Sequence, residues 1–123
     1  MSKVERAVDQ WLLESVEGAL GVLGASVREA LLIYLMKKRS ISREEIPRRI
    51  DDVLPCLEEL LGYGAKVVEK IAVKTFAEKS AISLSVAEGM RLPELVRLVR
   101  RTKNQHGQMV ERDHTRQHSL RVG

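Results

Sequence analysis

The spacing of the apolar residues restricts the fold of this chain more than any other feature, because they recur at steps of three and four in segment after segment. Such spacing aligns side chains on one face of a helix, whereas a half-buried strand needs alternation. The first segment predicts a helix from Lys3 to about Glu17. Its stripe consists of Val4, Ala7, Val8, Trp11, Leu12 and Ser15.

Three glycines spaced by three follow this stripe in the run "GALGVLG". Each glycine costs about 1 kcal/mol relative to alanine inside a helix, which favours a frayed helix end and a loop. The alternative is a helix that continues while its glycines allow a neighbouring backbone to approach closely. A phosphate-binding loop is disfavoured, since no strand precedes the run and no Lys-Ser/Thr pair follows it.

The second helix is expected from Val27 to about Arg39, with Ser26 and Glu29 as a capping box. This segment, "VREALLIYLMKKR", is apolar on nearly every side. A helix of that kind is normally buried all round. It is therefore either the central helix of the domain or a helix whose second face meets another subunit. In the second case we expect a homo-oligomer.

The middle of the chain contains further helix signals. Ser42 and Glu45 form a second capping box, and Pro47 limits the helix that it starts to one or two turns. Asp51 is a natural N-cap for the next helix, which two glycines end in "LLGYG". The stretch 65–79 fits a helix better than a strand, although "VVEKIAVKTF" is rich in β-forming residues.

The last predicted helix begins near Pro93 and ends near Lys103, with Gly107 as a stop signal. The sequence thus predicts an all-α fold, a small bundle of about five helices in residues 1–102. Residues 103–123 lack sustained periodicity and are expected to form a flexible polar and basic tail. Residues 91–123 hold 8 Lys/Arg against 3 Asp/Glu, while residues 1–90 hold 13 against 14, so the net charge of +4 belongs to the C-terminal third.

The sequence also indicates the cellular location that we expect for this chain. The longest apolar runs are far shorter than the roughly 20 residues of a spanning helix, and the charged N-terminus lacks the apolar stretch of a secretory signal. The only cysteine, Cys56, excludes an internal disulfide and a cysteine-based zinc site. We expect a cytoplasmic protein. Abundant charge together with a near absence of Asn and Gln before residue 103 is a thermophile tendency.

No catalytic constellation is recognisable in the sequence, and no cofactor is expected. The adjacent carboxylates at 44–45, 51–52 and 58–59 point about 100° apart on a helix, so they do not face each other. A serine nucleophile needs a histidine base within reach, and all three histidines lie in the predicted tail. These histidines, with Asp113 beside them, are conceivable but disfavoured metal ligands; they are His106, His114 and His118.

A nucleic-acid-binding regulator is the alternative that the basic residues raise. The stretch "SISREEIPRRI" followed by "DDVLPCLEELLGYG" resembles a helix-turn-helix in outline, with 65–79 as a wing, and a basic C-terminal arm adds positive charge. The supposed reading helix is acidic, however, and base readout relies on Arg, Lys, Asn or Gln. The candidate phosphate contacts are Lys37, Lys38, Arg39, Arg43, Arg48, Arg49, Arg97, Arg100 and Arg101.

Residues 24–79 resemble a family of small archaeal domains called the Nitrosopumilus output domain, in "VREALLIYL", "ISREEIP" and "LLGYGAKVVEKIAVKTF". The resemblance implies an archaeal all-helical module related to signal output, with no reaction and no functional residues to transfer. We therefore expect a non-catalytic interaction module with a regulatory role. Its expected partner is a second copy or another protein, and a membrane is not expected as a partner.

Overall fold

The structure is a computed structural model that describes the backbone of residues 2–116 and the side chains of residues 2–104. Within these limits all regular structure is helical, with five longer helices, one short helix and a 3-10 turn at Arg43–Glu45. The helices are α1 (Lys3–Val22), α2 (Ala25–Arg39), α3 (Ile50–Leu61), α4 (Gly64–Ser80), α5 (Leu84–Ala87) and α6 (Leu92–Arg116). The predicted all-α bundle is confirmed.

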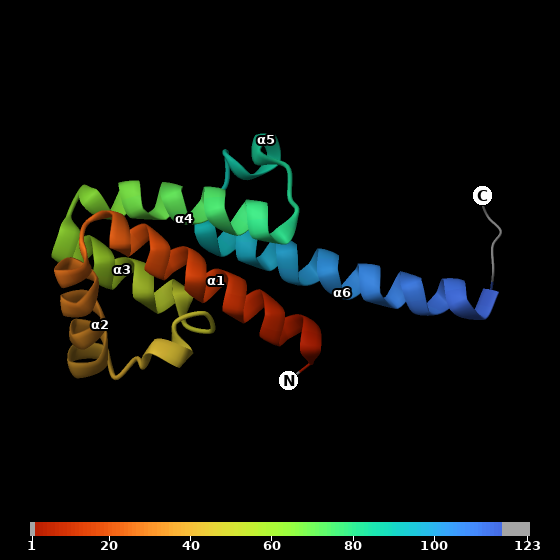
Figure 1. Ribbon diagram of the computed structural model, residues 1–123, viewed down its shortest axis with the longest axis horizontal. Coiled ribbons are helices and arrows are strands. Elements are labelled where there is room, and N and C mark those ends of the chain that lie inside the picture. The colour runs from red at the N-terminus through yellow and green to blue at the C-terminus, as the bar shows by residue number, and fades with distance from the viewer. Residues whose placement is uncertain (1, 117–123) are drawn as a thin grey trace.

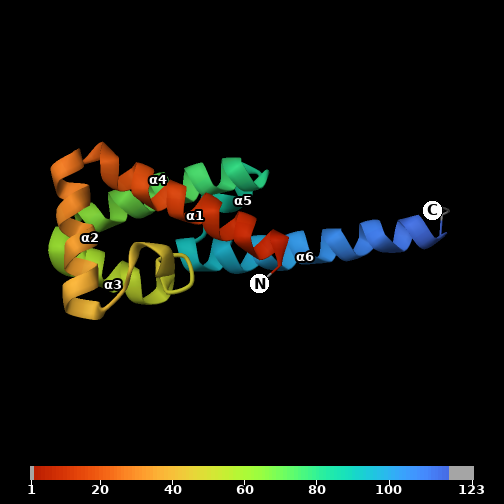
Figure 2. The same ribbon diagram turned by 60° about the horizontal axis from the view of Figure 1, so that its bottom comes forward.

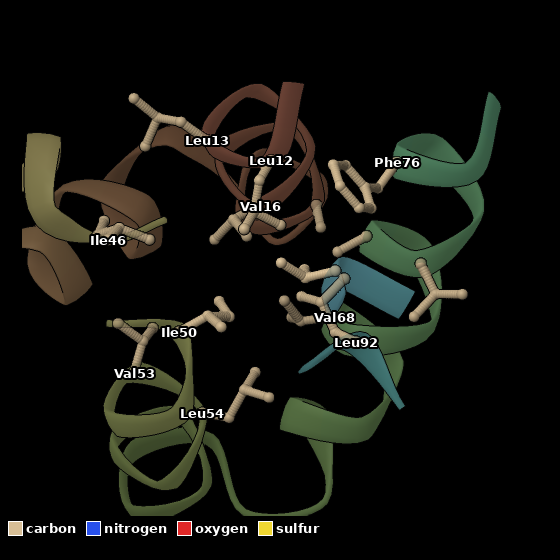
Figure 3. Packing of buried hydrophobic residues seen from close by; sticks show 14 of the residues in the cluster. Leu12, Leu13, Val16, Ile46, Ile50, Val53, Leu54, Val68, Phe76 and Leu92 are labelled. Atoms are coloured by element: carbon tan, nitrogen blue, oxygen red, sulfur yellow. The ribbon is translucent and has the colours of Figure 1, made fainter. Parts of the chain in front are cut away.

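The centre of the bundle is the pair α1 and α4, which pack against each other along much of their lengths (Figure 1). Leu12 and Val16 of α1 point toward Phe76 and Val68 of α4, and Leu92 from the start of α6 closes the same core (Figure 3). All five side chains are buried. The apolar stripe predicted for the first helix is therefore the face that builds the core.

Helix α1 is five residues longer than predicted, because it continues through Gly18 and Gly21 to Val22. Burial of Val16, Ala19 and Leu20 offsets the conformational cost of the two glycines. The prediction of a frayed helix end at these glycines was therefore wrong. The alternative, that the helix continues because its glycines allow a neighbouring backbone to approach closely, was right about the helix but wrong about the reason within the described residues. A Cβ built on Gly18 or Gly21 would meet no atom within 4 Å, so no backbone packs against either glycine.

The connection from α1 to α2 is short, and the capping box predicted at Ser26 and Glu29 is not formed. Gly24 forms the N-cap with a φ of 116°, a conformation that glycine adopts without steric cost. Since α2 begins at Ala25, Ser26 lies inside the first turn and cannot cap it. The prediction of a cap at Ser26 was wrong because the longer α1 leaves only two residues for the turn.

The second capping box is present, since the Ser42 backbone N–H donates to Glu45 Oε1 at 2.9 Å. Helix α3 starts at Ile50, one residue before the predicted cap at Asp51, and ends at Gly62 with a φ of 57°. Gly64 begins α4 instead of extending the loop. The stretch 65–79 is helical throughout, so the predicted alternative of a β-wing is wrong.

The chain after α4 departs most from the prediction. Helix α5, a single turn, was not predicted, and α6 continues to Arg116 instead of ending near Lys103. One glycine costs too little to stop a helix whose neighbours favour it, so Gly107 did not end α6. The backbone beyond Lys103 projects past the bundle at the end opposite α2 (Figures 1 and 2). The tail was predicted for residues 103–123: the backbone is helical as far as Arg116, and residues 117–123 lie outside the described residues. The division of the chain at residue 102 stays a prediction.

Candidate functional surfaces

The basic corner is the set of six predicted phosphate contacts between Lys37 and Arg49, and its arginines are engaged within the fold. Arg39 Nη2 lies 2.9 Å from both carboxylate oxygens of Glu59 on α3. Tyr34 Oη donates to the same carboxylate at 3.0 Å. The hydrogen bond from Arg39, followed by that from Tyr34, lowers the pKa of Glu59, and the same contacts raise the pKa values of Arg39 and Tyr34.

Arg43 makes a two-pronged contact with Glu17 of α1, whose side chain is only 17% exposed. Its Nη2 donates to Glu17 Oε1 at 2.9 Å, and its Nε donates to Oε2. Hydrogen bonding to Glu17 raises the pKa of Arg43. Paired parallel hydrogen bonds of this kind fix geometry as well as charge, so Arg43 ties the 3-10 turn to α1.

Asp9 on α1 joins two arginines that are distant in sequence. Arg100 Nη2 donates to Asp9 Oδ1 at 2.7 Å, and Arg48 Nε lies 3.7 Å from Oδ2. Arg49 Nε lies 3.3 Å from Asp52 Oδ2, and its Nη1 lies 3.5 Å from the Ser40 carbonyl oxygen at the end of α2. Arg49 therefore reaches from the start of α3 to the end of α2, while Arg48 reaches α1.

Five of the nine predicted phosphate contacts are thus in ion pairs. The other four are exposed and have no ion pair within 4 Å among residues 2–104. They are Lys37, Lys38, Arg97 and Arg101. Because an arginine held by a carboxylate is neutralised before a phosphate arrives, this corner is better suited to holding helices together than to a phosphate backbone.

Four of the six acidic residues that the sequence offers for catalysis lie in the first turn of a helix, and a fifth, Glu59, is paired with Arg39. Asp51 and Asp52 lie in the first turn of α3, where negative charge complements the helix dipole. Glu45 completes the capping box, and the hydrogen bond from the Ser42 backbone is the main reason that its pKa is lowered. Across the described side chains, no three His, Cys, Asp or Glu residues converge to hold a metal ion. The side chains of His106, Asp113, His114 and His118 lie outside that part of the chain.

Exposed apolar side chains gather at the end of the bundle where α2 lies. Seven of the nine large hydrophobic side chains that are exposed among residues 2–104 belong to the α1–α2 junction, the outer face of α2 and the α3–α4 turn. We call this set the apolar end; it consists of Val22, Leu23, Ile33, Met36, Leu60, Tyr63 and Val67. All three segments lie at the same end of the molecule in both views (Figures 1 and 2).

Helix α2 explains why this surface is apolar. Only Leu31 and Leu35 of α2 are buried, whereas Ile33 and Met36 are 53% and 50% exposed on the side away from the bundle. Of the two alternatives for this helix, the one that makes it the central helix is wrong, because the pair α1 and α4 forms the centre of the bundle. The contributions of Leu60, Tyr63 and Val67 were not predicted, because the chain turns between Leu61 and Gly64 and no helical spacing connects residues on its two sides.

The remaining two exposed hydrophobic residues, Leu84 and Val86, belong to α5. A cleft of about 760 Å³ separates α5 and its loops from α4, and it lies near the lysines of α4. Sequence reasoning missed this cleft because it did not predict α5.

No match was found when the chain was compared with protein-family models, with curated proteins and with solved structures. None of the helices described here has the length and apolar character needed to cross a membrane.

Proposed function

We propose that this chain is a non-catalytic interaction module that forms a homodimer through the apolar end. The observation that supports this proposal most strongly is the concentration of seven of the nine exposed large hydrophobic side chains of residues 2–104 at one end of the molecule. Monomeric proteins rarely leave a large contiguous apolar patch in water, so such a patch is typical of an interface.

A second copy of the chain is the occupant that this surface fits best. In a two-fold dimer the same patch meets itself, so an apolar patch finds a complementary partner without any other protein. A standard interface buries about 800 Å² on each partner. That area is about a tenth of the 7467 Å² surface of this chain.

The regulatory role and the archaeal output-domain resemblance stay predictions, as does the cytoplasmic location. No family model matches the chain, so the functional proposal depends on the surface alone. The nucleic-acid alternative also stays a prediction, and the pairing of five of its nine proposed contacts argues against it.

The test is a pair of glutamates placed at the centre of the outer face of α2, Ile33→Glu with Met36→Glu. Both side chains point away from the core, so the variant should fold while the desolvation of two charges opposes dimer formation. We expect the wild type to sediment as a dimer and the variant as a monomer, with a dissociation constant raised at least about 100-fold.

The matched control is Arg6→Gln with Arg101→Gln, which lowers the net charge by the same two units at exposed positions outside the apolar end. This control should remain dimeric. Equal sedimentation of the wild type and the glutamate variant, with helical content unchanged, would contradict the proposed interface.

A further inference from the structure

The cleft between α4 and α5 is a groove with an apolar floor and a charged rim. Figure 1 shows α5 raised on its connecting loops above α4. The apolar residues that line the groove include Val73, Ala87, Met90 and the exposed Leu84. A volume of about 760 Å³ lies within the range of sites that hold a ligand or part of a partner chain.

A row of three lysines follows the α4 side of the groove: Lys66, Lys70 and Lys74. Their spacing of four places them on one face of α4, and at about 1.5 Å per residue the row is about 12 Å long. All three are exposed, and none has an ion pair within 4 Å among residues 2–104. Lys66 Nζ lies 5.8 Å from the centre of the Tyr63 ring, so the row presents three positive charges that no carboxylate of the described side chains neutralises.

The groove is built on a fixed frame. Glu69 Oε2 on α4 accepts hydrogen bonds from Arg91 Nε and from the Leu92 backbone N–H, each at 2.8 Å. Burial alone would raise the pKa of Glu69, but these hydrogen bonds from Arg91 and Leu92 lower it below its ordinary value. Arg91 is thus held by the protein, and the carboxylate of Glu69 secures the loop that leads from α5 into α6.

We infer that this groove binds an acidic amphipathic helix of a partner protein. A helix with carboxylates at every fourth position has the same axial spacing as Lys66, Lys70 and Lys74, whichever way it runs. Its apolar face would lie over Leu84 and Met90, as in other helix-in-groove complexes. Because all nine exposed large hydrophobics of the described side chains are on α5 or at the apolar end, this is the second surface with uncovered apolar area.

Two other occupants fit the groove less well. A small monoanion would use one lysine and leave the rest of the 12 Å row unpaired. A nucleic acid would bring phosphates close to Glu58 and Glu88, which line the same groove. An acidic helix avoids this repulsion, since its carboxylates occupy one face only and can turn toward the lysines.

The probe for this inference is a fluorescent helical peptide of about 15 residues with glutamates at every fourth position and leucines on the adjoining face. Fluorescence anisotropy measures its binding to the full chain. Replacing the lysine row with Lys66→Gln, Lys70→Gln and Lys74→Gln should weaken binding about tenfold, since each exposed ion pair contributes about twofold. The matched control, Lys3→Gln with Lys37→Gln and Lys38→Gln, should change binding by less than about twofold.

Two further measurements separate this inference from its rivals. The Ile33→Glu, Met36→Glu variant should bind the peptide as the wild type does, so failure of the dimer proposal leaves this result unaffected. A peptide with lysines in place of the glutamates should not bind. Equal binding of the acidic peptide to the lysine-row variant and the wild type would overturn the inference. Tighter binding of a single-stranded DNA at the same three lysines would overturn it as well.

Discussion

The arginines of the basic corner and the lysines of α4 are both dense in positive charge, yet the fold treats them differently. Four arginines between positions 39 and 49 have carboxylate partners on α1 or α3, some with two hydrogen bonds. The three lysines on α4 face a groove and have no such partner among the described residues. Charge density in the sequence therefore does not identify a binding surface, and the α4 lysines differ from the corner arginines in combining unpaired charge with a groove.

The chemistry of the two side chains agrees with this division. The planar guanidinium of arginine matches a carboxylate with two parallel hydrogen bonds, which suits fixed links between helices. The ammonium of lysine is strongly hydrated and lies at the end of a flexible side chain, which suits an exposed surface that binds a partner. The comparison predicts that substitutions in the corner alter stability, and that substitutions in the row alter binding.

The largest effect on stability is expected from Asp9→Ala. Asp9 is 15% exposed and joins Arg100 of α6 and Arg48 of the 46–49 turn, so its loss leaves a partly buried guanidinium without its charge partner. We expect the free energy of unfolding to fall by about 2 kcal/mol, measured by urea denaturation. Lys70→Ala is the matched control in the row, with a change within about 0.5 kcal/mol. Similar losses of unfolding free energy for Asp9→Ala and Lys70→Ala would contradict the distinction between the corner arginines and the α4 lysines.

A pH-dependent effect is expected from Glu69→Gln. The pKa of Glu69 is lower in the folded protein, so its stabilisation is fully present above the ordinary glutamate pKa of about 4.3 and is lost as the pH falls below it. The variant should be about 1–2 kcal/mol less stable at neutral pH, and the two stability curves should converge in acid. Urea denaturation across a pH series measures both.

Glu88→Gln is the control for this pH series, because Glu88 lines the same groove and its side chain forms no ion pair within 4 Å among residues 2–104. Its stability should follow that of the wild type at every pH to within about 0.5 kcal/mol. If the unfolding free energies of Glu69→Gln and the wild type differ by the same amount down to strong acid, the charge of Glu69 has no part in the effect.

The smallest expected effect is that of Arg43→Gln. Arg43 is half-exposed, so solvent screens its ion pair with Glu17, and we expect a loss of about 0.5–1 kcal/mol. Peptide binding in the α4–α5 groove should not change. Weaker peptide binding by Arg43→Gln than by the lysine-row variant would reverse the assignment of the two surfaces.

The helices were largely predictable from the sequence because their signals are local. The stripe of α1, the cap at Ser42 and the helical spacing of 65–79 each depend on residues within one or two turns. Helix ends were less predictable, since burial of Leu20 and its neighbours extends α1 past two glycines. A local pattern contains no information on whether tertiary contacts offset a helix-breaking residue.

The candidate surfaces were less predictable than the helices, because they depend on contacts between distant residues. Asp9 and Arg100 are 91 positions apart, and Arg39 and Glu59 are 20 apart. No spacing rule connects them, so the pairing of the corner arginines could not be predicted from local patterns. The groove was not predicted for a related reason. Helix α5 is a single turn, and its position depends on the loop that Glu69 holds through a contact between distant residues.

The central claim is that this chain forms a homodimer through the apolar end, and sedimentation equilibrium of the unmodified chain tests it most directly. The chain has a mass of 13.9 kDa. We predict that the measured mass approaches twice this value as the protein concentration rises through the micromolar range. A mass that stays at 13.9 kDa at every concentration would contradict the claim.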